Sequence, residues 1–599
     1  MTKNPTYTGL KILLGFTCLS PVIYSTSLMD MQLAQKMSFF CVSLILFLVY
    51  LLQFTEIDEI RFYKPLSILM LLFPLTFFTS FFNGSESLLI LQLTNLAVPL
   101  TIILLTVLIF LVLGEDDFFK LFSFSVVAVS TLFSVIGLME VYGINIILLP
   151  TIIGPGSTLG HRSFAAEFLL TSLPFLLIAN KYVNKKNKQV LLLFAFIQIS
   201  FLFFTRNRSA MVIMLVILVL YFLFILFKKK KGRRIKFVLP VAAVMLISIL
   251  FALQPVNGSQ RPEMGSTVET FFNTDYKSNR LRLKYWNASL QMITENPFIG
   301  MGLMKWSGYF PKYSGEYFND DNVFYVQSIH SHNDILELGS ENGLTASLIF
   351  LLIIFFVCYS LWEKSKSDEK YLYLLFSFLI TVAFSFVAFP IHKFSSFFSA
   401  SVAAGVALLN IRGEMRSVIN IKYNQLKIVV MLLLIIGVVV SFIKIESEVS
   451  LKEAINAKDA RRYILMRQKL DDVSTIFYPF DPAKQPVDYY RAIANYRLKN
   501  FTEALKLDIK ARDLAPYNAP IMRNIAGTYQ TIGNFEKSEK LYEEFKDIFP
   551  NYIDPQINLI GVYFQQGETN KAKNLLEELL KKAPQNSRLL EIQKKISTD

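Results

Sequence analysis

Residues 329–362 read IHSHNDILELGSENGLTASLIFLLIIFFVCYSLW, a polar stretch with two of the chain's four histidines followed by an apolar run long enough to cross a membrane. Asn333 or Asp334 can cap a short helix after the histidines. Three residues would give that helix an apolar side: Ile335, Leu336 and Leu338. The pattern places His332 at the mouth of the helix. It fits either a capped amphipathic turn at the lipid interface or a site in which His332 is a catalytic base.

Composition sets the class of protein. Of the 599 residues, 53% are hydrophobic, 55 are Phe, and the mean hydropathy is +0.43. These values are typical of polytopic membrane proteins and not of soluble enzymes. The net charge of +14 does not require a nucleic acid partner, because Lys and Arg collect in the cytoplasmic loops of membrane proteins. We therefore expect membrane lipids, and no nucleic acid, around this chain.

Apolar runs predict an all-α bundle of about 12–13 membrane spans. The run at 88–113 contains Pro99 and is counted as one span, which gives thirteen. The predicted spans lie near 9–28, 37–54, 64–83, 88–113, 118–138, 164–180, 189–205, 209–227, 237–254, 343–362, 370–389, 394–411 and 427–443. Residues 1–444 would form this membrane domain, with a polar insertion at 255–342.

The basic residues predict the orientation of the bundle. With the N-terminus inside, the cytoplasmic loops hold Lys181, Lys185, Lys186, Lys188, Lys228 to Lys231, Arg233, Arg234, Lys236, Lys364, Lys366, Lys370, Arg412, Arg416 and Lys422. The insertion and the C-terminus would then lie outside the membrane, in the periplasm. This orientation brings four polar clusters to the outer face: His161-Arg162, Arg206-Asn207-Arg208, the stretch at 330–334, and His392-Lys393.

The tail after Lys444 is charged and repetitive. Pro516, Pro550 and Pro584 are 34 residues apart, and Gly533 and Gly567 mark turns between helices at the same step. This period resembles the tetratricopeptide repeat, a helix–turn–helix unit that stacks into an α-solenoid. We expect a helical connector at 445–485 and a periplasmic solenoid at 486–599, with the clearest match at 486–590. The concave side of such a solenoid holds a peptide or helix, so a protein partner is expected there.

Charged residues on the outer face are the candidate site. Arginine at a membrane edge either anchors the helix or binds an anion; anchoring is favoured for Arg206, and the outward position indicates that one of Arg206 and Arg208 binds a negative ligand. Arg282 lies in the first turn of a predicted helix over 279–294, which either rests on the membrane with Trp286 as its interface anchor or lets Arg282 reach a diphosphate from above. His330 and His332, with Asp334 and Glu337, lack the spacing of a zinc motif, so no metal is predicted. Convergence of His161 and His392 in space stays open.

Together these motifs resemble the O-antigen ligase and polymerase superfamily of bacterial envelope glycosyltransferases. The resemblance rests on residues 205–210 (TRNRSA), on Arg282 through Trp286 to residues 297–302 (PFIGMG), and on residues 330–333 (HSHN). Residues 160–167 (GHRSFAAE) also resemble a family segment, and the similarity covers about 60–410. Asn207 and Ser209 stand where the family often has Ser and Gly.

The resemblance implies a glycosyltransferase of the bacterial inner membrane. It would move a glycan from a polyprenyl-diphosphate carrier to an acceptor hydroxyl on a lipid or a protein. By resemblance, Arg208 and Arg282 bind the diphosphate and His332 activates the acceptor. Accessory roles fall to Arg206, His330, Asn333, His161 and Arg162. No cofactor is expected, and direct displacement would invert the sugar carbon.

Rival functions share part of this pattern. A polymerase of glycan repeat units or a protein O-oligosaccharyltransferase would use the same site with another acceptor, and the repeats slightly favour a protein. A transporter of lipid-linked glycan would need charges in the middle of its spans and paired repeats of spans. The sequence shows polar clusters at one surface instead, which favours the transferase.

Overall fold

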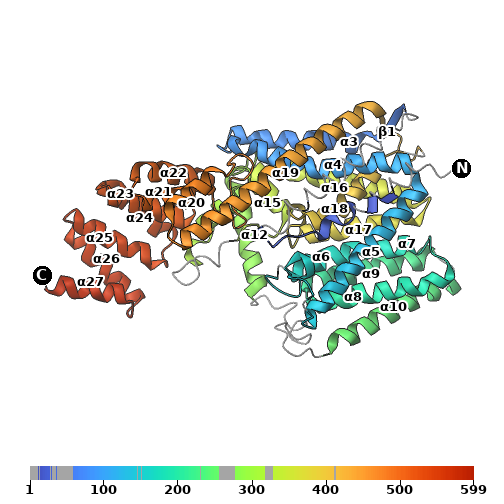
Figure 1. The fold of residues 1–599 in the computed structure, drawn as a ribbon, viewed down its shortest axis with the longest axis horizontal. Coiled ribbons are helices and arrows are strands. Elements are labelled where there is room, and N and C mark those ends of the chain that lie inside the picture. The colour runs from blue at the N-terminus through green and yellow to red at the C-terminus, as the bar shows by residue number, and fades with distance from the viewer. Residues whose placement is uncertain are drawn as a thin grey trace.

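The computed structural model is almost entirely helical. It describes residues 11–29 except 13, 16 and 27, residue 36, residues 58–254 except 145, 150, 229 and 230, and residues 277–317, 328–410 and 413–598. Within these residues the one named sheet has two antiparallel strands, β1 (Glu59–Tyr63) and β2 (Val418–Lys422). Figure 1 shows a helical bundle at one end of the molecule and the C-terminal helices at the other, with α12 and α15 between them.

Eight of the described helices are long and apolar enough to cross a membrane. The bundle consists of α3 (Lys64–Leu72) with η2 (Phe73–Phe81), α4 (Leu89–Leu113), α5 (Glu115–Val141), α6 (Arg162–Ser172) with α7 (Pro174–Ala179), α8 (Lys188–Phe204), α9 (Arg208–Lys228), α10 (Lys231–Leu253), α16 (Leu344–Ser365), α17 (Glu369–Ser385), α18 (Phe394–Leu408) and α19 (Tyr423–Asp459). Every predicted span from residue 64 onward coincides with one of these helices, although α10, α17 and α18 are not among the eight. Helix α4 runs through Pro99 as a single helix. The predicted span at 9–28 is described only in part, and the one at 37–54 lies outside the described residues.

Contacts between loops identify the two ends of the bundle. At one end the Lys370 ammonium lies 2.8 Å from both Glu115 and Asp116, and Lys181 pairs with Asp368. At the other end the Lys393 ammonium lies 2.6 Å from Glu167. We call the second end the repeat end, because the C-terminal helices lie beside it (Figure 1). The polar clusters that the sequence placed on one membrane face gather at the repeat end.

The described parts of the insertion, residues 277–317 and 328–342, are mostly helical and lie at the repeat end (Figure 1). Its elements are α12 (Lys277–Glu295), α13 (Trp306–Tyr309), η6 (Phe310–Tyr313), η7 (Gly315–Tyr317) and α15 (Asp334–Asn342). The loop 297–302 closes over the C-terminal end of α15, where the Met301 N–H donates to the Ser340 carbonyl at 2.7 Å. Gly300 has φ +68°, and a Cβ there would lie 2.3 Å from the Glu341 carbonyl carbon. Only glycine fits this position without displacing backbone.

The tail forms helix pairs after a long connector. Helix α19 continues for 37 residues, well past the predicted span at 427–443, and α20 (Tyr463–Asp471) follows it. The pairs are α21 (Val487–Arg497) with α22 (Phe501–Leu514), α23 (Ala519–Thr531) with α24 (Phe535–Ile548), and α25 (Ile553–Gln565) with α26 (Thr569–Lys582), followed by α27 (Ser587–Thr598). Gly533 and Gly567 have φ of +81° and +80° in the turns within pairs, as the sequence predicted.

Candidate functional site

The N-terminus of α15 fixes the histidine stretch. Asn333 is the N-cap: its Oδ1 accepts hydrogen bonds from the Ile335 and Leu336 N–H groups, both at 3.1 Å. Its Nδ2 donates to the Phe386 carbonyl at 3.2 Å, which ties the cap to the end of α17. The predicted cap is therefore confirmed, and it holds His332 immediately before the helix.

His332 is held in an uncommon backbone conformation. Its φ is +57°, in the left-handed region that residues other than glycine seldom adopt. The Trp286 Nε1–H donates to the His332 carbonyl at 3.4 Å, and the Tyr285 ring stacks on the imidazole at 5.7 Å between centroids. The Phe389 ring meets the imidazole edge-on at 5.0 Å. Aromatic rings therefore contact the imidazole on two sides.

Burial and positive neighbours keep the His332 imidazole unprotonated. Burial is the main cause and repulsion by Arg282 the next, and together they lower the pKa of His332 to about 3. A neutral imidazole has one ring nitrogen with a free lone pair. At neutral pH, His332 can therefore accept a hydrogen bond from a hydroxyl group placed beside it, and a bound anion that raises its pKa would strengthen it as a base.

Arg208 and Arg282 come together from different helices. Arg208 is the first residue of α9, and Arg282 lies in the second turn of α12. Burial and then repulsion by Arg208 lower the pKa of Arg282, while Glu167 acts in the opposite direction. Two guanidinium groups that repel each other in a partly desolvated place form a strong site for an anion. Since Arg282 also acts on His332, the three predicted site residues share one region.

Arg206 has a different role from Arg208. Its side chain is 5% exposed, and its Nη2 donates to the Ala252 carbonyl at 2.6 Å, while Nη1 donates to the Phe203 carbonyl at 3.1 Å. These bonds tie the C-terminal ends of α8 and α10 together. The guanidinium of Arg206 therefore serves the packing of the bundle, in agreement with the anchoring role.

A second cluster lies on the other side of Phe389. His330 Nδ1 lies 2.7 Å from Glu337 Oε1, and His392 Nε2 lies 3.2 Å from the same oxygen. The two imidazoles stack at 4.1 Å, and His330 also stacks on Phe389 at 4.5 Å. Burial lowers the pKa of His330 to about 4, so its neutral ring can donate a hydrogen bond to an ionised Glu337. The sequence left the convergence of His392 open, and the structure brings it here.

The donor set of this cluster is one that a transition metal accepts. The ligand atoms of His330, Glu337 and His392 lie within 4.8 Å of one another, and two imidazoles with one carboxylate resemble a zinc site. Both oxygens of Glu337 already have partners, however: Oε1 bonds to His330, and Oε2 accepts from the Ser331 N–H at 2.7 Å.

His161 and Arg162 lie at the start of α6. His161 is the N-cap, with its Nδ1 accepting from the Ser163 N–H at 3.1 Å, and its ring lies 4.7 Å from that of Phe164. Burial, then Lys393 and Arg162, lower the pKa of His161 to about 4. His161 does not belong to the group formed by His330, Glu337 and His392, but it lines the same cavity.

A buried ion pair lies between the two halves of the site. The Lys393 ammonium and the Glu167 carboxylate are each 2% exposed and lie 2.6 Å apart, and the Ser396 hydroxyl donates to Glu167 at 2.9 Å. The ammonium also lies 4.2 Å from the centre of the Phe389 ring. The pair therefore fixes the loop that carries Phe389 and His392 against α6.

Replacing Lys393 alone should destabilise the protein strongly, because Glu167 would remain buried without its partner. We expect Lys393→Met to lower the free energy of unfolding by about 3–5 kcal/mol. Thermal unfolding in detergent measures the change. The double variant Glu167→Leu/Lys393→Met removes both charges and should lose much less. Equal or additive losses in the single and double variants would contradict this role.

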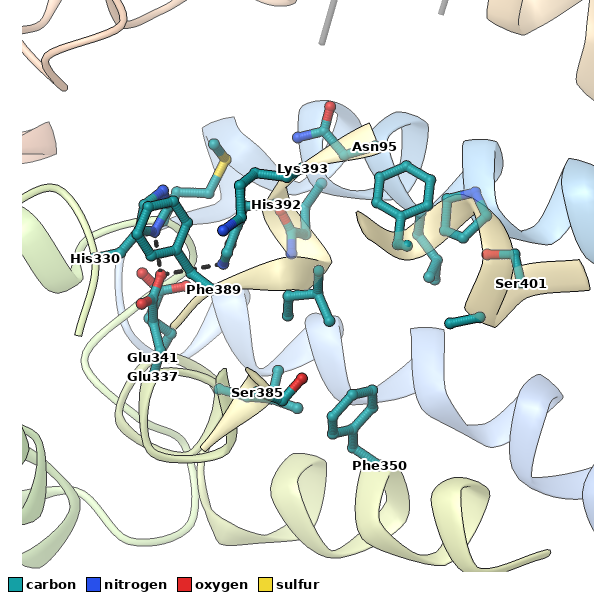
Figure 2. A pocket seen from close by; sticks show the side chains of 18 of the residues that line it. Asn95, His330, Glu337, Glu341, Phe350, Ser385, Phe389, His392, Lys393 and Ser401 are labelled. Atoms are coloured by element: carbon teal, nitrogen blue, oxygen red, sulfur yellow. Dashed lines mark hydrogen bonds and ion pairs between the residues drawn. The ribbon is translucent and has the colours of Figure 1, made fainter. Parts of the chain in front are cut away.

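A cavity of about 640 Å³ runs from the second cluster into the bundle. Its polar end holds His330, Glu337, Glu341, His392, Lys393 and Lys484. Its other end lies among apolar residues of the membrane helices, including Pro99, Ile103, Phe350 and Phe397. Figure 2 shows His330, Glu337 and Glu341 gathered at one end and Phe350 and Ser401 toward the other. Residues 477–482 and 484 of the connector also line the cavity, so the tail takes part in the site.

Sequence reasoning misread the buried face of α15. It predicted an apolar side formed by Ile335, Leu336 and Leu338, whereas in the structure Ile335 and Leu336 are half-buried and the glutamates Glu337 and Glu341 are buried. Burial and then Glu337 raise the pKa of Glu341 to about 7, and its Oε1 accepts from the Trp306 N–H at 3.0 Å. The spacing of four residues between the two glutamates is the signal that would have placed them on one helical face.

Comparisons with known proteins bear on this geometry. A family model described as O-Antigen ligase matches residues 193–351, from α8 into α16, a stretch that contains Arg208, Arg282 and His332. A model described as Tetratricopeptide repeat matches residues 541–596. No curated protein matches the chain. One solved structure, "Crystal structure of APC/C hetero-tetramer Cut9-Hcn1", matches at 11% identity over 80% of this chain and 83% of that chain, with a TM-score of 0.22, from which nothing is inferred.

The two family models agree with the membrane helices, the helix pairs and the motifs that the sequence presented. The chain is a multi-pass membrane protein that is similar over residues 193–351 to the O-antigen ligase family and over residues 541–596 to the tetratricopeptide repeat.

Proposed function

We propose that the protein transfers a glycan from a polyprenyl-diphosphate carrier to an acceptor hydroxyl at the outer face of the bacterial inner membrane. The observation that carries the proposal is the meeting of Arg208, Arg282 and His332 at the repeat end, from three separate elements. A guanidinium pair suits a diphosphate, and a neutral imidazole suits a hydroxyl group. The substrate therefore has its phosphates and its reacting carbon at adjoining positions.

The reaction is a direct displacement. The acceptor oxygen attacks the anomeric carbon, and the bond between that carbon and the diphosphate oxygen breaks, with its electron pair staying on the diphosphate. His332 takes the proton of the acceptor hydroxyl, while Arg208 and Arg282 stabilise the charge on the departing group. Attack opposite the leaving group inverts the sugar carbon.

The pH dependence should differ between the free protein and the complex. In the free protein His332 has a pKa of about 3, so kcat/KM for the donor should stay level as the pH falls from about 7 to about 5. A bound diphosphate places negative charge beside Arg282 and raises the pKa of His332. The acid limb of kcat should therefore lie at higher pH than that of kcat/KM, and the reverse order would count against His332 as the base.

Transfer should not depend on a divalent cation. Arg208 and Arg282 neutralise the charge of the leaving diphosphate, which a metal ion would otherwise do. The Glu337 carboxylate is hydrogen-bonded to His330. We expect unchanged kcat in excess EDTA, measured on purified protein after dialysis. Loss of transfer in EDTA with recovery on adding zinc would instead assign a metal to the group formed by His330, Glu337 and His392.

The proposed orientation follows from the basic loops. The loops around Lys181, Lys370 and Lys422 lie at the end of the bundle opposite to the repeats, and such loops face the cytoplasm. Residues 1–444 then form the membrane domain, and the insertion and the repeats at 486–599 lie in the periplasm. A cysteine accessibility assay on intact cells, with probes at 184 and 585, tests this arrangement.

The acceptor decides between related enzymes. A repeat-unit polymerase or a protein O-oligosaccharyltransferase would use the same donor and the same three residues, and the repeats would favour a protein as acceptor or partner. Transport of the lipid-linked glycan is the less favoured alternative, since Glu167 pairs with Lys393 near the repeat end.

The test replaces Arg208, Arg282 and His332 singly by Ala in cells that make the lipid-linked glycan. After membrane insertion is confirmed, we expect loss of the transferred product and accumulation of the polyprenyl-linked donor in each variant. Normal product in all three would remove the enzymatic proposal.

A further inference from the structure

The repeats and the insertion share one apolar core. Insertion residues Tyr285, Ala288, Met292, Met301, Trp306 and Phe310 form a single buried cluster with Ala519, Met522, Phe545, Phe549 and Tyr552 of the repeats. Trp306 is fully buried there. This face of α23 and α24 is therefore occupied by a segment of the same chain.

Two hydrogen bonds to backbone carbonyls of the insertion cross this contact. The Tyr517 N–H donates to the Gly308 carbonyl at 3.1 Å, and Asn551 Nδ2 donates to the Glu316 carbonyl at 2.6 Å. A Cβ on Gly315 would lie 1.8 Å from the Ile548 carbonyl oxygen. Such an approach is possible only without a side chain, so Gly315 marks the place where the insertion seats on the repeats.

The shared core extends to His332. The Trp306 and Phe310 rings stack at 5.1 Å, and both meet the Tyr285 ring edge-on, at 6.0 and 5.2 Å. Tyr285 in turn stacks on the His332 imidazole at 5.7 Å. His332 has φ +57°, a conformation that persists only where surrounding contacts hold it. The apolar cluster shared with the repeats thus continues through these stacked rings to His332.

We propose that the tetratricopeptide repeats are an internal positioning element for His332, acting through the segment at 306–317 and through the ring of Tyr285. This inference rests on the proposed role of His332. Tyr285 is then a positioning residue. The repeats have a structural role within this chain, in addition to any binding of a partner elsewhere on their surface.

The test disturbs the contact between the repeats and the segment at 306–317 without altering a site residue. Gly315→Ala forces the segment away from Ile548, and displacement of a base by about 1 Å can lower kcat by about a hundredfold. We expect a fall of about ten- to a hundredfold in kcat, with little change in the KM of the donor. Gly561→Ala is the matched control, because the nearest atom to its Cβ lies 3.6 Å away, and it should keep the wild-type rate.

Variants of Tyr285 test the connection itself. Tyr285→Leu removes the ring and should lower kcat as much as Gly315→Ala does, whereas Tyr285→Phe keeps the stacking and should retain most of the activity. The double variant Gly315→Ala/Tyr285→Leu should be no slower than the slower single variant, because both changes break one path. Hydrogen exchange of residues 306–317 verifies that Gly315→Ala has loosened the segment.

The outcomes separate this inference from the proposed function. Faster exchange in Gly315→Ala with wild-type kcat, while His332→Ala is inactive, would overturn the positioning role alone. If the two single-variant losses in kcat multiply in the double variant, the inference would also be overturned, because the repeats would then affect His332 by a path that does not include Tyr285. An active His332→Ala variant would instead overturn the role of His332.

Discussion

Replacing Arg282 by Ala should lower kcat for transfer by about 10²–10³-fold, the usual effect of removing one group that stabilises a developing negative charge. Arg282 is half-buried and close enough to Arg208 to be repelled by it. Without Arg282, a single guanidinium would meet the charge of the departing diphosphate. The rate of polyprenyl diphosphate release by purified protein measures the effect.

Arg280 provides the control for the loss of one positive charge from this helix. Arg280 lies on the same helix and is exposed, so Arg280→Ala makes the same change in net charge away from the site and should keep nearly the wild-type rate. Arg282→Lys keeps the charge but loses the two parallel hydrogen bonds, and it should fall between the other variants. Equal losses in Arg280→Ala and Arg282→Ala would contradict a specific site at Arg282.

Replacing His332 by Ala should lower kcat by about 10²–10⁴-fold, the usual contribution of a positioned base. The donor should still bind with nearly the wild-type KM, since the two arginines remain in place. Added imidazole should restore part of the rate by occupying the space between Tyr285 and Phe389. A loss of donor binding in this variant, or no rescue by imidazole, would assign His332 a structural role.

Local patterns predicted most of the fold. Apolar runs located the membrane helices, the basic loops located one end of the bundle, and the spacing of Gly533 and Gly567 located the helix pairs. The expectation that Arg208, Arg282 and His332 lie on one face of the bundle came from the same count of spans and basic loops. These features depend on residues close in sequence or on a count of spans.

Contacts between distant segments could not be predicted in this way. The helix expected at 279–294 is present as Lys277–Glu295. The repeats cover its residues Ala288 and Met292, and no local pattern shows where a solenoid packs. Similarly, Glu337 is covered by His392, which lies in the turn between α17 and α18, more than 50 residues away in sequence.

The most direct test is the stoichiometry of the reaction in lipid nanodiscs. Purified protein, polyprenyl-diphosphate-linked glycan and a hydroxyl acceptor are mixed, and released polyprenyl diphosphate and transferred glycan are both measured. We predict equal amounts of the two, an inverted sugar carbon in the product, and neither product with Arg282→Ala. Lipid-linked glycan that stays intact with wild-type protein, or crosses a liposome membrane without cleavage, would contradict glycan transfer.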